Sequence, residues 1–249
     1  MRILCTNDDG LHSKGLELLT DLCGGLGEVF CVAPDREQSA TSHSLTLHRP
    51  LRAIPRGERR WQVDGTPTDC VVLALGALLD PPPDVVVAGI NHGPNMGEDV
   101  LYSGTVAAAM EAQILGVPGI AVSFAGSDHD LIPSHVAGVQ QLLRRILGVE
   151  RLPPETLLNI NLPPIPGGQV RGVRITTLGK RVYDGSLSRM KDPWGREIFW
   201  IGGGRPVWSG GEEVDFKAVE DGYISVTPLH VDLTNYPLLE AVRSWRLGE

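Results

Sequence analysis

Short apolar runs alternate with amphipathic stretches through the first two thirds of the chain. The apolar runs are too short for helices and predict buried strands. The stretches between them have apolar residues at helical spacing and predict helices. This order predicts an α/β fold with a mainly parallel sheet, right-handed crossovers and helices on both faces. The expected strands are Arg2–Thr6, Val29–Ala33, Arg60–Asp64, Asp84–Ile90, Ile120–Phe124 and Leu157–Leu162, and the expected helices cover Leu16–Leu22, Thr66–Leu79, Ser103–Leu115 and His135–Leu147.

The pattern changes after about Pro163, where glycine and proline become frequent. The alternation around Tyr223–Leu229 favours antiparallel strands, and a short final helix is expected around Leu238–Trp245. Trp194–Ile201 and Tyr223–Leu229 are too apolar for free hairpins, so we expect both to pair with another subunit.

No linker or internal repeat separates the two parts of the chain. We therefore predict a single domain over residues 1–249. Its α/β core covers residues 1–163, and residues 164–249 supply C-terminal strands, oligomerisation arms and the final helix.

Composition narrows the class of protein. Of the 249 residues, 42% are hydrophobic and 21% are charged, which is typical of a globular chain. The net charge of −8 argues against binding a nucleic-acid polymer or an anionic membrane through the overall field. The four cysteines lie in apolar stretches without C-x-x-C spacing, which favours reduced core thiols and a cytoplasmic location. No apolar run has the roughly 18 residues of a membrane span, and no signal peptide is apparent.

Polar residues follow the predicted strands at the edge of the sheet where ligands bind in open α/β folds. Asp8 and Asp9 come directly after the first strand. Two adjacent carboxylates are costly to hold together unless a cation neutralises them, and a divalent metal would do so. The alternative is an ordinary turn, because Asn-Asp and Asp-Gly are common turn formers.

Three further segments are candidates, and each has a structural alternative. The hydroxyl-rich segment 35–47 contains Ser39 and is long for a strand-to-helix connection, but it could be a solvated loop. Asn91 and Asn95 follow the Asp84–Ile90 strand in a turn-forming sequence. Ser103–Thr105 opens a helix, where serine is an ordinary N-cap and where backbone N–H groups also bind phosphate.

Together these segments offer carboxylate, amide and hydroxyl oxygens, which favour Mg²⁺ or Mn²⁺ over Zn²⁺. The sequence has no G-x-G-x-x-G after a strand, no P-loop and no G-x-S-x-G motif. These absences weaken the dinucleotide-binding, NTPase and esterase interpretations.

The order and content of these motifs resemble the SurE family of stationary-phase survival proteins, which are metal-dependent nucleotidases. The resemblance covers nearly the whole chain, and its motifs stand in the family's order. The matching segments are Arg2–Gly10, Ala33–Leu47, Val63–Val71, Gly89–Gly97, Tyr102–Val106, Asn159–Pro163, Asp192–Arg196 and Ser225–Leu229.

The resemblance implies a Rossmann-like core whose C-terminal arms exchange between subunits in a homodimer or homotetramer. It implies one divalent cation per subunit, Mg²⁺ or Mn²⁺, and hydrolysis of 5′- and 3′-nucleoside monophosphates, with polyphosphate as a further substrate. Asp8 and Asp9 would be the catalytic residues that hold the metal, and one of them would orient or deprotonate the attacking water. The metal ligands would be Asp8, Asp9, Ser39 and Asn91, and the substrate contacts Ser39, Asn95, Ser103, Gly104 and Thr105.

Two positions depart from the family pattern. Ala40 stands where glycine is common beside Ser39, and this would stiffen the loop; Trp194 stands where arginine is usual. A different class of function stays open from the residues alone, because phosphate-binding loops also occur in regulators that hold a nucleotide without hydrolysing it. An interaction scaffold is a third interpretation, but it leaves the polar residues at the sheet edge unexplained.

Overall fold

The computed structural model describes residues 1–149, 152–182, 187–201, 207–245 and 247. Within them the main sheet has nine strands in the order β3-β4-β2-β1-β5-β6-β7-β13-β8. The six strands from β4 to β7 in this order are mutually parallel, as the sequence predicts. They are β4 (Arg60–Val63), β2 (Glu28–Pro34), β1 (Arg2–Thr6), β5 (Val85–His92), β6 (Gly119–Phe124) and β7 (Leu157–Leu162).

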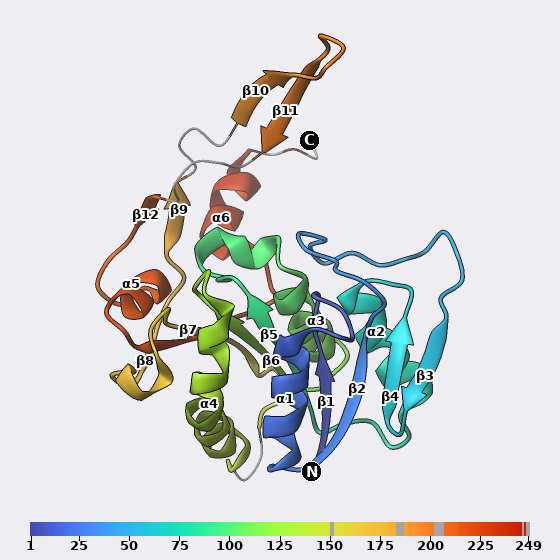
Figure 1. Ribbon diagram of the computed structural model, residues 1–249. Coiled ribbons are helices and arrows are strands. Elements are labelled where there is room, and N and C mark those ends of the chain that lie inside the picture. Colours follow the sequence, from blue (N-terminus) through green and yellow to red (C-terminus); the bar gives the residue numbers. More distant parts are fainter. Residues whose placement is uncertain (150–151, 183–186, 202–206, 246, 248–249) are drawn as a thin grey trace.

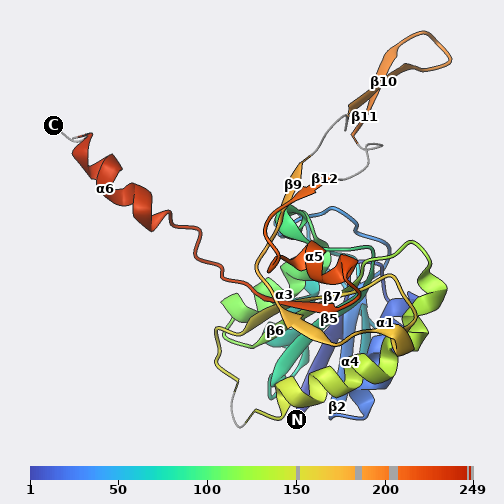
Figure 2. The same cartoon turned by 90° about the vertical axis from the view of Figure 1, so that its left-hand side faces the viewer.

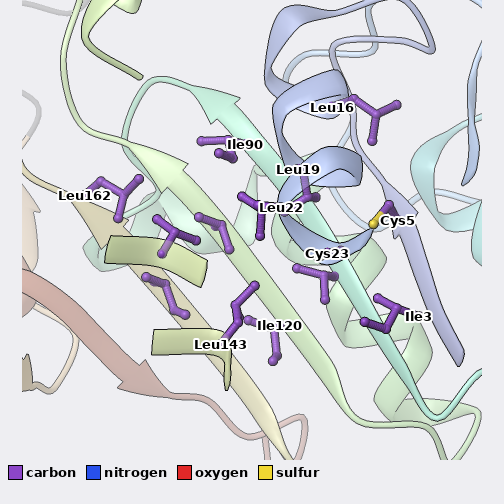
Figure 3. Packing of buried hydrophobic residues seen from close by; sticks show 14 of the residues in the cluster. Ile3, Cys5, Leu16, Leu19, Leu22, Cys23, Ile90, Ile120, Leu143 and Leu162 are labelled. Carbon is purple, nitrogen blue, oxygen red and sulfur yellow. The ribbon is translucent and has the colours of Figure 1, made fainter. Parts of the chain in front are cut away.

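Helices cover both faces of this sheet (Figure 1). On one face lie α1 (Lys14–Gly24) and α4 (Ile132–Leu147), and on the other lie α2 (Pro67–Leu73) and α3 (Gly104–Ile114). Figure 3 shows leucines of α1 and Leu143 of α4 packing onto aliphatic side chains of the strands. Each such fully buried side chain contributes about 2 kcal/mol of burial free energy, so the two-sided core fixes the positions of the strand ends.

The C-terminal strands differ in part from expectation. β13 (Ile224–Pro228) lies in the main sheet, antiparallel to β7, and β8 (Val173–Ile175) pairs parallel to it. Ile224 and Val226 are buried in the core. The expectation that Tyr223–Leu229 forms an intersubunit arm is therefore wrong, because the apolar face of this strand is covered by its own subunit.

Two other segments do project from the body. β10 (Leu187–Lys191) and β11 (Glu197–Ile201) form an antiparallel hairpin, and this hairpin extends away from the sheet (Figures 1 and 2). The two-stranded pair β9 (Lys180–Val182) and β12 (Val207–Ser209) lies between the hairpin and the body. The helix α6 (Tyr236–Ser244) ends an extended segment that leaves the body in another direction (Figure 2).

Several short elements were not predicted from the sequence pattern. β3 (Ala53–Gly57) and α5 (Asp215–Glu220) were not expected, and the predicted helix 66–79 is α2 followed by a π-helical turn, Ala74–Leu78. A helix long and apolar enough to cross a membrane is not found among the residues described above.

Candidate active site

The predicted site residues meet at the carboxyl ends of β1 and β5, where the strand order reverses direction. A cavity of about 630 Å³ opens there. The loops after β1, β2 and β5 and the N-terminus of α3 form its wall. The predicted residues that line it are Asp8, Ser39, Asn91, Asn95 and Ser103.

Asp8 lies at the base of the site and is only 4% exposed. Its carboxylate accepts hydrogen bonds from the hydroxyl of Thr105 and from the Thr105 backbone N–H, the latter at 3.2 Å. Burial raises the pKa of Asp8 to about 6, against the lowering effect of the Thr105 hydroxyl. The neighbouring Asp9 charge raises it further. A carboxylate in this setting gains from a nearby cation.

The carboxylate of Asp9 is also placed so that a nearby cation would stabilise it. Burial raises the pKa of its carboxyl group, and the charge of Glu37 adds to this, while the backbone N–H of His92 opposes it. The Oδ2 atom of Asp9 is buried and accepts no hydrogen bond from the described residues. An orphaned carboxylate oxygen beside a second buried carboxylate fits a bound cation.

Ser39 lies on the loop after β2, and this loop is tied to Asp8. The backbone N–H of Gln38 donates to the carbonyl oxygen of Asp8 at 2.7 Å, and the Ser39 hydroxyl donates to Glu37 at 2.7 Å. Ala40 has φ +56°, a left-handed conformation that glycine adopts more easily. Ala40 is therefore a strained residue next to Ser39.

A register irregularity in β5 sets the position of Asn91. The pairing of β5 with β6 shifts between Ala88 and Asn91, and such bulges re-aim side chains beside functional sites. Gly89, at φ +140°, lies in this segment, and a Cβ there would come within 2.2 Å of the carbonyl oxygen of Val122. The amide nitrogen of Asn91 donates to the Gly93 carbonyl at 3.0 Å, so its amide oxygen is the atom left for a cation.

Asn95 is held by a buried polar network that sequence reasoning missed. Its backbone N–H donates to Asn161 at 2.9 Å, and its carbonyl oxygen accepts from Asn159 at 2.7 Å and from Asn161 at 2.9 Å. Its side-chain amide donates to Ser123 at 2.8 Å. The available signal was the pair of asparagines within the apolar strand β7, since buried amides require partners.

The start of α3 brings the predicted phosphate contacts to the site in different ways. Ser103 is the N-cap, and its hydroxyl accepts from the Val106 N–H at 3.1 Å while the residue lines the cavity. Thr105 is fully buried and its hydroxyl is bonded to Asp8. A Cβ on Gly104 would lie 2.9 Å from the Cβ of Asp8, so glycine allows α3 to approach Asp8 closely. Neither Gly104 nor Thr105 lines the cavity.

Residues that were not predicted as site residues also line the cavity, among them Asp99, Tyr102, Arg181 and Ile201 of β11. Asp99 and Tyr102 belong to the 3-10 turn before α3 (Gly97–Leu101, capped by Tyr102), and Arg181 lies on β9. In the part of the chain that the structure describes, three or more His, Cys, Asp or Glu side chains do not cluster as a metal site. A cation at this site would therefore also use hydroxyl and amide oxygens.

Comparisons with known proteins identify the family and the fold. The family model described as "Survival protein SurE" matches residues 3–185. A protein of Gemmatimonas aurantiaca named "5'-nucleotidase SurE" is 60% identical over 98% of both chains. One of the same name from Geotalea uraniireducens is 50% identical over 99% of this chain and 100% of its own.

Among solved structures, the SurE protein of Aquifex aeolicus matches with a TM-score of 0.88 and 40% identity, covering 98% of this chain and 99% of that one. Both the expected fold and the expected family are thereby confirmed. The chain belongs to the SurE survival protein family.

Proposed function

We propose that this protein is a divalent-metal-dependent 5′-nucleotidase that hydrolyses nucleoside monophosphates to nucleoside and phosphate. The names of its full-length relatives support the reaction. The observation that carries the proposal is the adjacent pair Asp8 and Asp9, of which Asp8 lines the cavity, with raised pKa values and one orphaned carboxylate oxygen. A protein that only held phosphate would gain nothing from two carboxylates facing an anion.

Asp8, Asp9, Ser39 and Asn91 would hold the cation through oxygen atoms. One Mg²⁺ or Mn²⁺ per subunit matches this ligand chemistry. When bound, such an ion stabilises charge on the phosphoryl oxygens and lowers the pKa of coordinated water.

The substrate phosphate would lie between this pair and the start of α3. We assign its contacts to the hydroxyls of Ser39 and Ser103 and the side chain of Asn95, near the N-terminus of α3, where the positive end of the helix dipole favours an anion. Asp8 or Asp9 would accept a proton from the attacking water. Thr105 serves this reaction by fixing the carboxylate of Asp8, to which both its N–H and its hydroxyl donate.

The first test is phosphate release from AMP, GMP, 3′-AMP and short polyphosphate, with Mg²⁺, with Mn²⁺ and with EDTA. We expect metal-dependent release of phosphate from 5′-monophosphates. Asp8→Asn should lower kcat by about 10²- to 10⁴-fold, because a ligand and a charge that stabilises the transition state are both lost. The matched control is Asp21→Asn, which changes an exposed aspartate of α1 and should leave the rate unchanged.

Near-normal turnover in Asp8→Asn would contradict the assignment of this residue. Nucleotide binding without release of phosphate, unaffected by EDTA, would replace the enzyme by a nucleotide-binding regulator. Release from 3′-AMP or polyphosphate would extend the substrate range to 3′-nucleotides or to exopolyphosphatase activity.

The same proposal includes a homodimer or homotetramer assembled through the hairpin β10–β11 and the α6 segment. Both are rich in exposed apolar side chains, among them Trp194 (78% exposed) and Ile201 (90% exposed). The proposal also treats residues 1–249 as one domain, which is supported by β13 and β8 completing the sheet of the N-terminal core. Four free, buried cysteines support a reducing compartment such as the cytoplasm.

A further inference from the structure

The cavity is larger than the phosphate end requires. Its volume of about 630 Å³ lies within the range of pockets that hold whole small molecules, whereas a phosphate group fills only a fraction of it. Asp8, Ser39, Asn91 and Ser103 account for one end. The remaining wall includes the turn before α3, β9, Ile201 at the end of β11 and residues 92–94.

Two planar side chains stand on that remaining wall. Tyr102 immediately precedes the phosphate-end residue Ser103, and its side chain is largely exposed at 54%. Its backbone is fixed, because its N–H donates to the Asp99 carbonyl at 3.0 Å and its own carbonyl accepts from the Ser42 N–H at 3.1 Å. The phenol ring is thus a solvent-facing surface on a rigid base, one residue from the phosphate site.

Arg181 supplies the second planar group. Its guanidinium donates to Asp99, and its centre lies 5.6 Å from the ring centroid of Trp208. Its backbone N–H donates to Glu98 at 2.6 Å. These contacts hold the guanidinium in one orientation at the cavity wall, and a guanidinium so held stacks well on an aromatic ring.

Asp215 connects the turn before α3 to the start of β9. It is fully buried, and its carboxylate accepts from the Gly97 N–H at 2.8 Å and from the Gly179 N–H at 2.9 Å. Gly97 begins the turn that presents Tyr102, and Gly179 directly precedes β9. One side chain therefore links the two segments that frame this end of the cavity.

The charge at this end argues against a second anion site. The positive charge of Arg181 is offset by Asp99, whose carboxylate accepts from the guanidinium and also lines the cavity. A further phosphate would be repelled by the Asp99 carboxylate, whereas a neutral planar ring would not be. The chemistry fits an aromatic base better than the next unit of a polyphosphate.

We propose that Tyr102 and Arg181 form the nucleobase subsite of this enzyme, with the base lying against the phenol ring and the guanidinium. This rests on the proposed nucleotidase function and adds the residues that select a nucleotide over other phosphate monoesters. Because stacking accepts any base, the subsite favours nucleotides in general over one particular base.

The test compares AMP with ribose 5-phosphate, which has the same phosphate and sugar but no base. We expect Tyr102→Leu and Arg181→Met each to lower kcat/KM for AMP by about 5- to 100-fold, the range of base stacking, chiefly through KM. The values for ribose 5-phosphate and short polyphosphate should stay within about twofold of the unchanged enzyme, since these substrates place no base there. Tyr102→Phe should retain the preference for AMP, and Arg145→Met, at an exposed arginine of α4, is the matched control.

Equal loss of activity toward AMP and ribose 5-phosphate, or no loss toward either, overturns the subsite. A selective loss toward polyphosphate in Arg181→Met would make Arg181 an anion anchor instead. A measurement on the unchanged enzyme covers the case in which a variant does not fold: adenosine should inhibit hydrolysis of ribose 5-phosphate competitively, whereas free ribose should not, and equal effects of the two would also overturn it. Failure of the unchanged enzyme to hydrolyse either monoester refutes the nucleotidase function itself.

Discussion

Neighbouring groups fix the position of both the side chain and the backbone of Asp8. Thr105 bonds both oxygens, the Gln38 N–H holds the backbone carbonyl, and Gly104 leaves room for α3 to approach. Burial then makes the charged form costly, so the pKa rises to about 6. A residue in this condition is oriented before a cation arrives and gains stability when one does.

Gly104→Ala tests the close approach of α3. The added Cβ would lie 2.9 Å from the Cβ of Asp8 and 3.0 Å from its Oδ2, so the carboxylate must move. We expect kcat to fall by about 10-fold or more, because a shift of a few tenths of an ångström misplaces a catalytic group. The control is Gly138→Ala in α4, where no atom lies within 4 Å; it should leave kcat unchanged and raise the free energy of unfolding by up to about 1 kcal/mol. Unchanged kcat in Gly104→Ala would refute the contact.

The raised pKa of Asp8 predicts how cation binding depends on pH. A cation requires the carboxylate, and below about pH 6 Asp8 is mostly protonated, so affinity should fall as pH drops through that value. We expect Mn²⁺ to raise Tm clearly at pH 7.5 and little at pH 5.0, as measured by thermal unfolding with and without EDTA. Without a cation the sign reverses, because the folded state retains a proton that the unfolded chain releases, and stability should decline as pH rises from about 4 to 6. An equal Mn²⁺ shift at both pH values would contradict this.

Residue identities at the strand ends could be predicted from the sequence, but their contacts could not. Asp8, Asp9, Ser39 and Asn91 follow β1, β2 and β5, whose carboxyl ends meet at one edge. The role of Thr105 toward Asp8 depends on a helix approaching a loop 97 positions earlier. The local sequence around either residue does not indicate that two residues 97 positions apart form a hydrogen bond.

At the scale of elements, the loop that contains Ser39 is anchored to the start of α2. The buried Asp69 accepts from the Thr46 N–H at 2.9 Å and from the Thr46 hydroxyl at 2.6 Å, and it also caps α2 through the Thr66 N–H at 2.8 Å. The Thr66 hydroxyl donates to the Ser44 carbonyl at 2.7 Å. The capping box that begins α2 therefore also anchors the end of the active-site loop.

Asp69→Ala tests this double role. Three donors lose their acceptor, so we expect the free energy of unfolding to fall by about 2 to 4 kcal/mol, as denaturant titration would measure. The looser loop should also raise KM for AMP more than it lowers kcat. Asp21→Ala, at an exposed helix position, serves as the control for both measurements. A variant that loses stability but keeps KM would limit Asp69 to capping α2.

Long apolar elements could be predicted, whereas short ones depended on tertiary contacts. The strands β1, β2, β4, β5, β6 and β7 and the helices α1, α3 and α4 appear close to their expected positions. β8 and β3 are edge strands with partly exposed faces, so their local pattern is weak. β13 has the apolar pattern of an arm, but only its pairing with β7 reveals that it belongs to the core.

At the scale of the whole molecule, the hairpin β10–β11 and the α6 segment leave the body with large apolar side chains exposed (Figure 2). A lone two-stranded hairpin is marginal in water, and exposed apolar patches of this kind mark interaction surfaces. We therefore expect light scattering at micromolar concentration to give the mass of a dimer or tetramer. Trp200→Glu, at a side chain that is 65% exposed, should shift the population to smaller species. The mass of a single chain for the unchanged protein would contradict the assembly.

The position of β13 has a consequence for the order of events on the ribosome. β7 is complete at Leu162, and its neighbour β6 precedes it in the chain. Its other neighbour, β13, is synthesised only after the entire hairpin region. Until then the nascent chain has an open edge at β7, with unpaired backbone groups that any other strand could bind. Pairing of β13, which lies in the last sixth of the chain, therefore closes this edge and ends the period in which the nascent chain is most prone to strand mispairing and aggregation.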